Sequence, residues 1–246
     1  MTKTKWLIIG AVAVTLGLMT GGAVLIWCFV SQDGHPELYG LTVYTTEQIP
    51  SAHPGYRRTL LTSGDKVYVN DYEEYSLRLF DIDPKTVVGR SPFGGGKICS
   101  IPGQPTNAYL AADCGSEMPS YEVFRNTQSP PFDWRHATFQ RMQLAMLLGP
   151  AANKQTTDPA LIQDVLRTLI DGTPTTAPSA LVTNTQEVHL FSDQLPGMIF
   201  SPSIYIDPTG NIYLAENYTV VDYRALKVQA RWIPASPLFT KWAQTR

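Results

Sequence analysis

The sequence has few charged residues, and none of them form long clusters. Asp, Glu, Lys and Arg make up 16% of its 246 residues, and 19 basic side chains nearly balance 21 acidic ones. The longest basic run outside the N-terminus is the pair Arg57–Arg58. A nucleic-acid-binding surface needs clustered Lys and Arg to displace counterions from phosphates. The composition therefore argues against a nucleic-acid partner, and a hydrophobic content of 43% argues against a disordered chain.

The sequence also lacks the linear motifs of common enzymes. Around Gly96-Lys97, Ser91 and Ile98 stand where a phosphate-binding loop needs Gly and Ser or Thr. The G-x-S-x-G and H-E-x-x-H motifs do not occur. Ser63-x-x-Lys66 matches the S-x-x-K of penicillin-binding proteins, but the K-T-G and S-D-N motifs that complete that site are missing. We therefore predict no catalytic residues.

Histidine is rare, and its positions do not suggest a metal site. The four histidines are far apart in the sequence: His35, His53, His136 and His189. Metal sites bring their ligands together at short, regular spacings. We therefore predict neither a metal nor a cofactor. Asp81 and Asp83 point to the same face of an extended chain, as an acid–base or metal pair requires, but Asp83-Pro84 more simply begins a turn.

One long apolar run is present at the N-terminus. Residues 7–30 contain no charged, Asn, Gln, His or Pro side chain. As a helix this run is roughly 36 Å long, enough to span a hydrocarbon core of about 30 Å. Because Lys3 and Lys5 precede it, the positive-inside rule places the N-terminus in the cytoplasm. We predict a short cytoplasmic N-terminus (1–6), a single-pass transmembrane helix that acts as a signal anchor (7–30), a tether (31–38) and an extracytoplasmic domain (39–246).

Two other interpretations of this run remain open. The small residues Gly21-Gly22-Ala23 resemble a signal-peptide cleavage site, although cleavage there leaves residues 24–30 as a bare hydrophobic start. Lipidation at Cys28 requires small residues before the cysteine, and Trp27 occupies that place.

Small residues recur every four positions within the same run. Ala13, Gly17 and Gly21 lie on one helix face, a spacing that lets two membrane helices approach closely and form a weak homodimer. The simpler explanation is that glycine is common in membrane helices.

Short β-prone runs separated by turn residues follow the tether. We expect strands at residues 41–46, 57–62, 66–70, 76–81, 97–101, 108–112, 121–124, 187–191 and 198–206. Ser63-Gly64-Asp65 predicts a hairpin between the second and third of these strands, and the sequence IDPTGNIY at 206–213 predicts another.

Helical periodicity appears in the middle of the chain. Residues 158–171 show Asp158 as a cap, Pro159 in the first turn and an apolar stripe that ends before Gly172. Apolar residues in 133–148 also recur at near-helical spacing, whereas 151–157 and 173–180 look like loops. The conformation of 220–233 stays open between strand and helix. The expected fold class is α+β, with an N-terminal transmembrane helix and one mixed, mainly antiparallel-sheet domain that carries two or three helices.

Only three cysteines are present. Cys28 lies in the predicted membrane helix, which leaves Cys99 and Cys114 in the outer domain. In an oxidising compartment two such cysteines usually pair, and a closed loop of about 15 residues stabilises a fold by roughly 3 kcal/mol. We predict a Cys99–Cys114 disulfide across a hairpin whose turn spans 102–107. The alternative is two buried thiols.

Tyrosine is abundant, with 12 residues. Three tyrosines lie close in sequence to three carboxylates: Tyr68, Tyr72, Tyr75, Asp71, Glu73 and Glu74. Exposed aromatic side chains beside carboxylates form binding surfaces for peptides or glycans. Tyrosines that alternate on a half-buried sheet are the commoner explanation. The glycosylation sequon Asn217-Tyr218-Thr219 has meaning only in a eukaryotic secretory pathway.

Three short segments carry a general resemblance to known proteins: GGGKICSIPG at 94–103, LPGMIF at 195–200 and IDPTGNIYL at 206–214. With the N-terminal anchor, the chain resembles the uncharacterised single-pass membrane-anchored proteins of Gram-positive bacteria, which carry a small extracytoplasmic domain. The resemblance implies a place in the cell envelope and transfers no activity. We expect a non-enzymatic domain that binds an envelope protein, peptide or glycan. The alternative is an envelope hydrolase without a readable linear motif.

Overall fold

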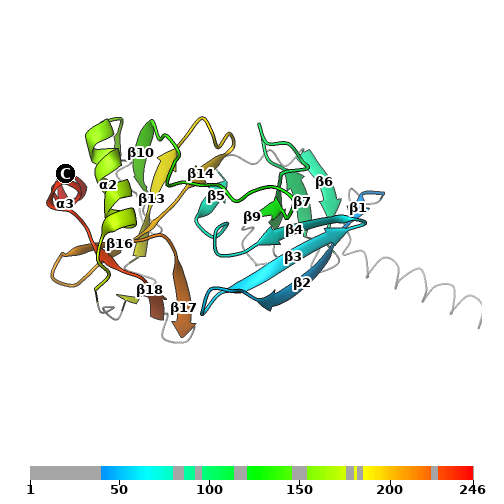
Figure 1. Ribbon diagram of the computed structural model, residues 1–246, viewed down its shortest axis with the longest axis horizontal. Helices are drawn as coiled ribbons and strands as arrows, with labels where there is room; N and C mark the ends of the chain where they lie inside the picture. The colour runs from blue at the N-terminus through cyan, green and yellow to red at the C-terminus, as the bar shows by residue number, and fades with distance from the viewer. Residues whose placement is uncertain are drawn as a thin grey trace, which may run out of the picture.

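The described part of the protein is mostly β-sheet. A computed structural model describes residues 40–79, 86–91, 96–113, 121–145, 154–175, 180–181, 185–222 and 227–245. These residues form strands β1 to β19 and two helices, α2 and α3 (Figure 1). The expected α+β class is therefore wrong.

The structure does not show the transmembrane helix named in the expected fold class. No helix within the described ranges is long and apolar enough to cross a membrane. Residues 1–39 lie outside those ranges, and with them the predicted anchor at 7–30, its stripe of Ala13, Gly17 and Gly21, and the tether at 31–38.

The N-terminal half curls into a near-barrel, here called the barrel. Its strands are β1 (Thr42–Val43), β2 (Thr45–Pro50), β3 (Arg57–Ser63), β4 (Lys66–Asn70), β6 (Val87–Arg90), β7 (Lys97–Ser100), β8 (Tyr109–Asp113) and β9 (Tyr121–Asn126). They are ordered β1-β6-β7-β8-β9-β4-β3-β2. The two outer strands, β1 and β2, are consecutive in the chain, with only Tyr44 between them. One extended segment thus pairs with β6 at one edge and with β3 at the other, which brings the two edges of the sheet together.

The hairpins predicted in this half are confirmed. β3 and β4 pair in antiparallel register up to Ser63 and Lys66, so Gly64 and Asp65 form a two-residue turn. Gly64 adopts φ 60°, a left-handed conformation that glycine adopts without steric cost. β7 and β8 also pair antiparallel, with Cys99 opposite Ala111.

A second sheet forms most of the C-terminal half. Its main path is ordered β11-β10-β13-β15-β16-β19, and β14 joins β13 to β5. The strands are β5 (Leu77–Leu79), β10 (Arg141–Ala145), β11 (Lys154–Thr156), β13 (Thr185–Phe191), β14 (Met198–Phe200), β15 (Ser203–Ile206), β16 (Ile212–Ala215) and β19 (Ile233–Pro234). β5 comes from the N-terminal half, so the chain leaves the barrel after β4, joins the second sheet, and returns at β6.

The helices lie against the second sheet. Helix α2 (Pro159–Asp171) confirms the prediction for 158–171: Asp158 accepts a hydrogen bond from the Ala160 amide, and Gly172 follows the last turn. Helix α3 (Pro237–Gln244), which the sequence reading missed, is capped by Ser236. A small third sheet contains β12 (Ala180–Leu181), β18 (Lys227–Ala230) and β17 (Tyr218–Asp222), so the open stretch at 220–233 contains strands.

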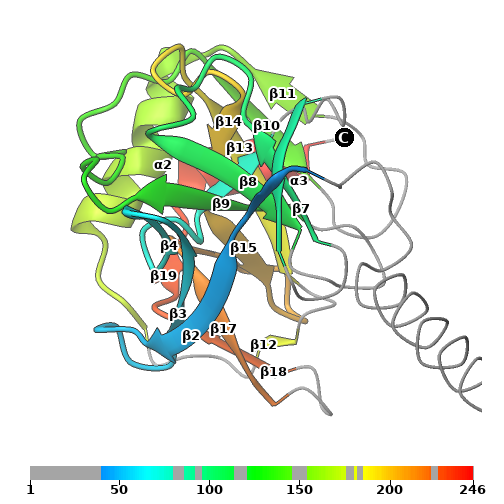
Figure 2. The same ribbon diagram turned by 90° about the vertical axis from the view of Figure 1, so that its right-hand side faces the viewer.

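The two halves share one hydrophobic core. In β7, β8 and β9, the aligned residues Cys99, Ala111 and Val123 point out of the barrel and are buried against the second sheet and α2. Their neighbours Ile98, Leu110 and Phe124 point into the barrel. These three strands are therefore buried on both faces. In Figure 2, which looks onto the barrel, β2 and β3 cross in front of the second sheet.

The expected helix at 133–148 is wrong. Residues 133–140 form turns and irregular structure, and Arg141–Ala145 form the strand β10. β10 lies between β11 and β13, and its Met142 is fully buried. The strand β11 likewise corrects part of the loop expected at 151–157. A short apolar run fits either period, and pairing with two neighbouring strands decided in favour of β structure.

Candidate functional site

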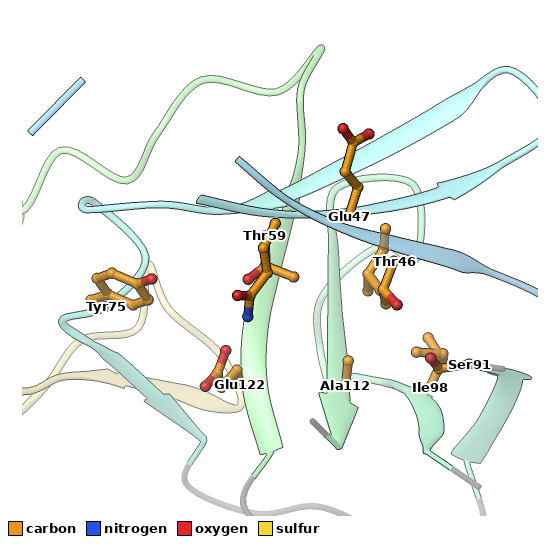
Figure 3. A pocket seen from close by; sticks show the side chains of 10 residues that line it. Thr46, Glu47, Thr59, Tyr75, Ser91, Ile98, Ala112 and Glu122 are labelled. Carbon is orange, nitrogen blue, oxygen red and sulfur yellow. The ribbon is translucent and has the colours of Figure 1, made fainter. Parts of the chain in front are cut away.

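The open end of the barrel forms a cavity of about 440 Å³, here called the mouth cavity. Because alternate residues of a strand point to the same face, the inner wall can be read from the strand register. Near the open end these inner side chains are short or polar, and they leave space above Leu61 and Ile98: Thr46, Gln48, Thr59, Ala112 and Glu122. Figure 3 shows this wall, with the Glu47 carboxylate pointing away from it. The volume lies within the range of small-molecule sites.

A second cavity of about 810 Å³ lies where the barrel meets the second sheet, and we call it the junction cavity. It shares Gln48, Tyr75 and Glu122 with the mouth cavity. Further tyrosines from three different parts of the chain line it: Tyr56, Tyr121 and Tyr218. The two cavities therefore meet at these shared residues, and together we call them the groove; its lining extends from the barrel opening to the second sheet.

Aromatic rings cluster beside the junction cavity. The rings of His53 and Tyr72 stack with centroids 4.0 Å apart, and Tyr56 meets Tyr72 edge-on at 4.8 Å. Tyr75 lies 5.4 Å from Tyr56 and donates a hydrogen bond to the Arg57 carbonyl. Burial raises the pKa of Tyr72, and the nearby Glu216 carboxylate raises it further. Tyr72 is therefore neutral at physiological pH, and the cluster forms an aromatic wall.

Glu74 is a buried carboxylate at the junction cavity. Its side chain is 1% exposed, and one oxygen accepts a hydrogen bond from Arg125. The other oxygen accepts from the Asp71 amide at 3.1 Å. Burial raises the pKa of Glu74 despite the opposing effect of Arg125. Because both oxygens already have donors, Glu74 holds together the loop that leads from β4 to β5.

Glu187 is the corresponding carboxylate in the second sheet. Arg78 from β5 donates to it at 3.0 Å, Ser201 donates at 3.0 Å, and His189 lies at 3.3 Å. Burial alone raises the pKa, but these three partners outweigh burial and lower the pKa of Glu187 to about 2. Glu187 is therefore ionised, and its ion pair with Arg78 links β5 to β13 within the second sheet.

Asn217 links the loop between β4 and β5 to the start of β17 in the third sheet. The Ser76 hydroxyl donates to Asn217 Oδ1 at 3.0 Å, and Asn217 Nδ2 donates to the Tyr72 carbonyl at 2.9 Å. Asn217 is buried. The amide nitrogen of the predicted sequon is thus occupied within the fold and inaccessible for glycosylation.

Two polar groups in the groove were not singled out by the sequence reading. Asn70 is 2% exposed; its Nδ2 donates to the Val123 carbonyl at 2.8 Å, and its Oδ1 has no hydrogen-bond partner among the described residues. Glu122 is half-buried, and its side-chain carboxylate forms no hydrogen bond or ion pair with any residue in the described ranges. The sequence signal that identifies such residues is the alternation of inward and outward side chains along a strand. By this alternation Asn70 and Glu122 occupy inward positions on β4 and β9.

The structure separates the tyrosines that the sequence grouped together. Tyr72 and Tyr75 belong to the aromatic cluster, whereas Tyr68 points into the barrel and donates to the Thr106 carbonyl at 2.9 Å. Among the carboxylates of that group, Asp71 accepts from Ser51, and Glu73 lies 3.6 Å from His53. A binding face for peptide or glycan stays a prediction.

The other sequence candidates that lie in the described ranges form no common site. Ser63 and Lys66 are paired across the turn between β3 and β4. Within the described ranges no three His, Cys, Asp or Glu side chains cluster as metal ligands do. Cys99 is buried in the shared core, while Cys114, Asp81 and Asp83 lie outside the described residues. The Cys99–Cys114 disulfide stays a prediction.

Searches with this sequence and structure found no match among protein-family models, curated proteins or solved structures. The groove is therefore interpreted from its own geometry.

Proposed function

We propose that this protein is a non-enzymatic binding protein of the cell envelope, and that its ligand lies in the groove formed by the mouth and junction cavities. The observation that supports this most strongly is the continuity of the two cavities through Gln48, Tyr75 and Glu122. Tyrosine side chains provide broad contact area with little loss of conformational entropy, and hydroxyl and amide groups add orientation. A segment of peptide or glycan suits such a groove.

The location is part of the proposal. The apolar run at 7–30 and the preceding lysines favour a single-pass anchor, with the N-terminus in the cytoplasm and the β domain outside. The partners of this arrangement are the lipid bilayer, through residues 7–30, and an envelope peptide, glycan or protein.

A hydrolase is the second candidate because two carboxyl groups, Glu74 and Glu122, line the junction cavity and the pKa of Glu74 is raised. A pair of carboxyl groups that flank the scissile bond is typical of glycoside hydrolysis. We prefer binding, since both oxygens of Glu74 accept hydrogen bonds within the fold and its side chain is almost completely buried.

Blocking the groove tests the proposal. Thr59→Trp places an indole in the mouth cavity, while Thr62→Trp makes the same change on the other face of β3. Saturation-transfer NMR on the full-length chain is used to screen a panel of short peptides and oligosaccharides. We expect wild type and Thr62→Trp to bind a common member of the panel, and Thr59→Trp to lose that binding with unchanged circular dichroism. Binding that survives in Thr59→Trp, or turnover of a panel member, contradicts the proposal.

A further inference from the structure

We propose that the groove recognises a primary ammonium group, and that Glu122 and Asn70 are its acceptors. This proposal rests on the proposed function and specifies the ligand chemistry of the same site. The shared chemistry has two natural sources, a lysine side chain of a peptide or an amino sugar of a glycan, and the experiment distinguishes them.

The first argument is an acceptor that lacks a donor. Asn70 Nδ2 donates to the Val123 carbonyl, and a carbonyl cannot donate in return, so the orientation of this amide is fixed. Its Oδ1 is therefore the atom left without a partner among the described residues. Leaving a buried acceptor unsatisfied is unfavourable, and native proteins rarely do so. Asn70 lines the junction cavity, so a ligand there is positioned to supply the missing donor.

The second argument is the balance of charge along the groove. Glu74 is paired with Arg125, and Arg78 is paired with Glu187. Arg57 lies exposed at the rim and donates to Gln48 Oε1 at 3.4 Å. Glu122 borders both cavities and has no cationic partner in the described ranges. Arg57 also lines the junction cavity, but its side chain is exposed to solvent, whereas that of Glu122 is half-buried. The half-buried unmatched charge in the groove is thus negative, and a half-buried carboxylate favours a positively charged partner.

The third argument is the set of tyrosines that line the groove. Tyr75 lines both cavities, and Tyr56 and Tyr121 line the junction cavity. A cation within about 6 Å of a tyrosine ring is attracted by the negative face of the ring. A carboxylate, an amide oxygen and several tyrosines together make a set of acceptors for an ammonium group. A neutral sugar matches the tyrosines and the amide but leaves the charge of Glu122 uncompensated.

The test uses pairs of compounds that differ in one ammonium group. Nα-acetyl-lysine-N-methylamide is compared with its norleucine counterpart, and glucosamine is compared with N-acetylglucosamine. Binding to the full-length chain is measured at about pH 6, where both amines are largely protonated. The variant is Glu122→Gln, and the matched control is Glu47→Gln. Glu47 is at the edge of the mouth cavity, and its carboxylate points away from the wall, so this control removes the same charge without removing an acceptor from the groove.

We expect at least one amine to bind more tightly than its neutral counterpart, and Glu122→Gln to weaken it by about tenfold, as expected for loss of one charge-assisted hydrogen bond. Glu47→Gln should have little effect. A preference confined to the lysine compound identifies a peptide source, and one confined to glucosamine identifies a glycan source.

Two results overturn the proposal in different ways. Equal binding of amine and neutral compounds, or no effect of Glu122→Gln, rejects ammonium recognition but leaves the groove as a binding site. Ammonium recognition is also rejected if none of the four compounds binds, while a peptide or oligosaccharide of the earlier panel binds to the wild type and not to Thr59→Trp. If the panel fails as well, the proposed function fails with it.

Discussion

The barrel and the second sheet bury their hydrophobic side chains in different ways. The second sheet buries one face against helix α2, helix α3 and the outer side of β7–β9, and large side chains such as Phe200, Met142 and Phe239 fill that space. The barrel closes on itself and contains a smaller core around Tyr44, Tyr68 and Phe124. Its inner side chains become short and polar toward one end. The shared core contains more of the large buried side chains, so we expect it to provide most of the stability, whereas the incompletely filled barrel leaves the space in which we propose that a ligand binds.

The pKa of a buried carboxylate is also shifted in opposite directions in the two halves. For Glu187, hydrogen bonds and the Arg78 charge outweigh burial and lower the pKa to about 2. For Glu74, burial outweighs Arg125, and the pKa is raised. Glu187 therefore favours folding in its ionised form, and ionisation of Glu74 opposes folding as the pH rises through its pKa.

The largest expected effect comes from emptying the barrel core. Phe124→Ala should lower the free energy of unfolding by about 3–5 kcal/mol, because Phe124 is fully buried. The neighbouring Val123 belongs to the shared core, so we expect both halves to unfold in one transition. Three of the five tryptophans, Trp134, Trp232 and Trp242, belong to the C-terminal half, and the other two precede the barrel. The change in tryptophan fluorescence during urea unfolding should therefore coincide with loss of amide protection in β3 and β4. Two separate transitions would show that the halves are independent domains.

The predicted disulfide gives the next effect. If Cys99 and Cys114 are bridged, Cys99→Ala, Cys114→Ala and the double variant should each lose about 2–4 kcal/mol, because either change opens the same loop. Peptide mapping under non-reducing conditions should recover the two cysteines in one linked species. If Cys99→Ala alone is destabilising and both thiols are alkylated in the wild type, Cys99 acts only as a core residue, and the case for an oxidising compartment weakens.

The pH dependence of stability distinguishes the two carboxylates. The ordinary pKa of Glu187 is 4.5 and its folded value is about 2, so its contribution is fully present above about pH 4.5 and is lost as the pH falls toward 2. Glu187→Gln should lower the free energy of unfolding at pH 7 by about 1–3 kcal/mol and flatten its dependence on pH between these values. Glu74→Gln should leave unchanged the loss of unfolding free energy between about pH 4.5 and 2. Denaturation midpoints measured from pH 2 to 7 test both, and a slope that disappears in Glu74→Gln would contradict the assignment.

Local chemistry made several elements predictable from the sequence. The Gly64-Asp65 turn, the hairpin at 206–213 and helix α2 each depend on residues close in sequence. In the second hairpin Asp207 accepts hydrogen bonds from the Thr209 hydroxyl, from the Asn211 side-chain amide and from the backbone amides of both residues, which together lower its pKa to about 2. Such features need only a few consecutive residues and survive any tertiary context that leaves them exposed.

The site was largely unpredictable for the opposite reason. Asn70, Glu122 and Tyr56 come from separate segments and carry no local motif. The sequence did place Tyr72 and Tyr75 among candidate binding residues, but it grouped them with Tyr68, which the barrel encloses. Strand β10 was misread because Met142 and its neighbours fit a helical period as well as a β period.

The sequence by itself determined the turns, helix α2, the mild overall charge and the apolar run at 7–30, because each depends on composition or on neighbours in the chain. Only the tertiary structure decided the mostly β class, the closure of the barrel through the consecutive strands β1 and β2, and the meeting of Asn70, Glu122 and the tyrosines in one groove. Strand pairing and burial between distant segments set these features, and those free energies arise only when the segments meet.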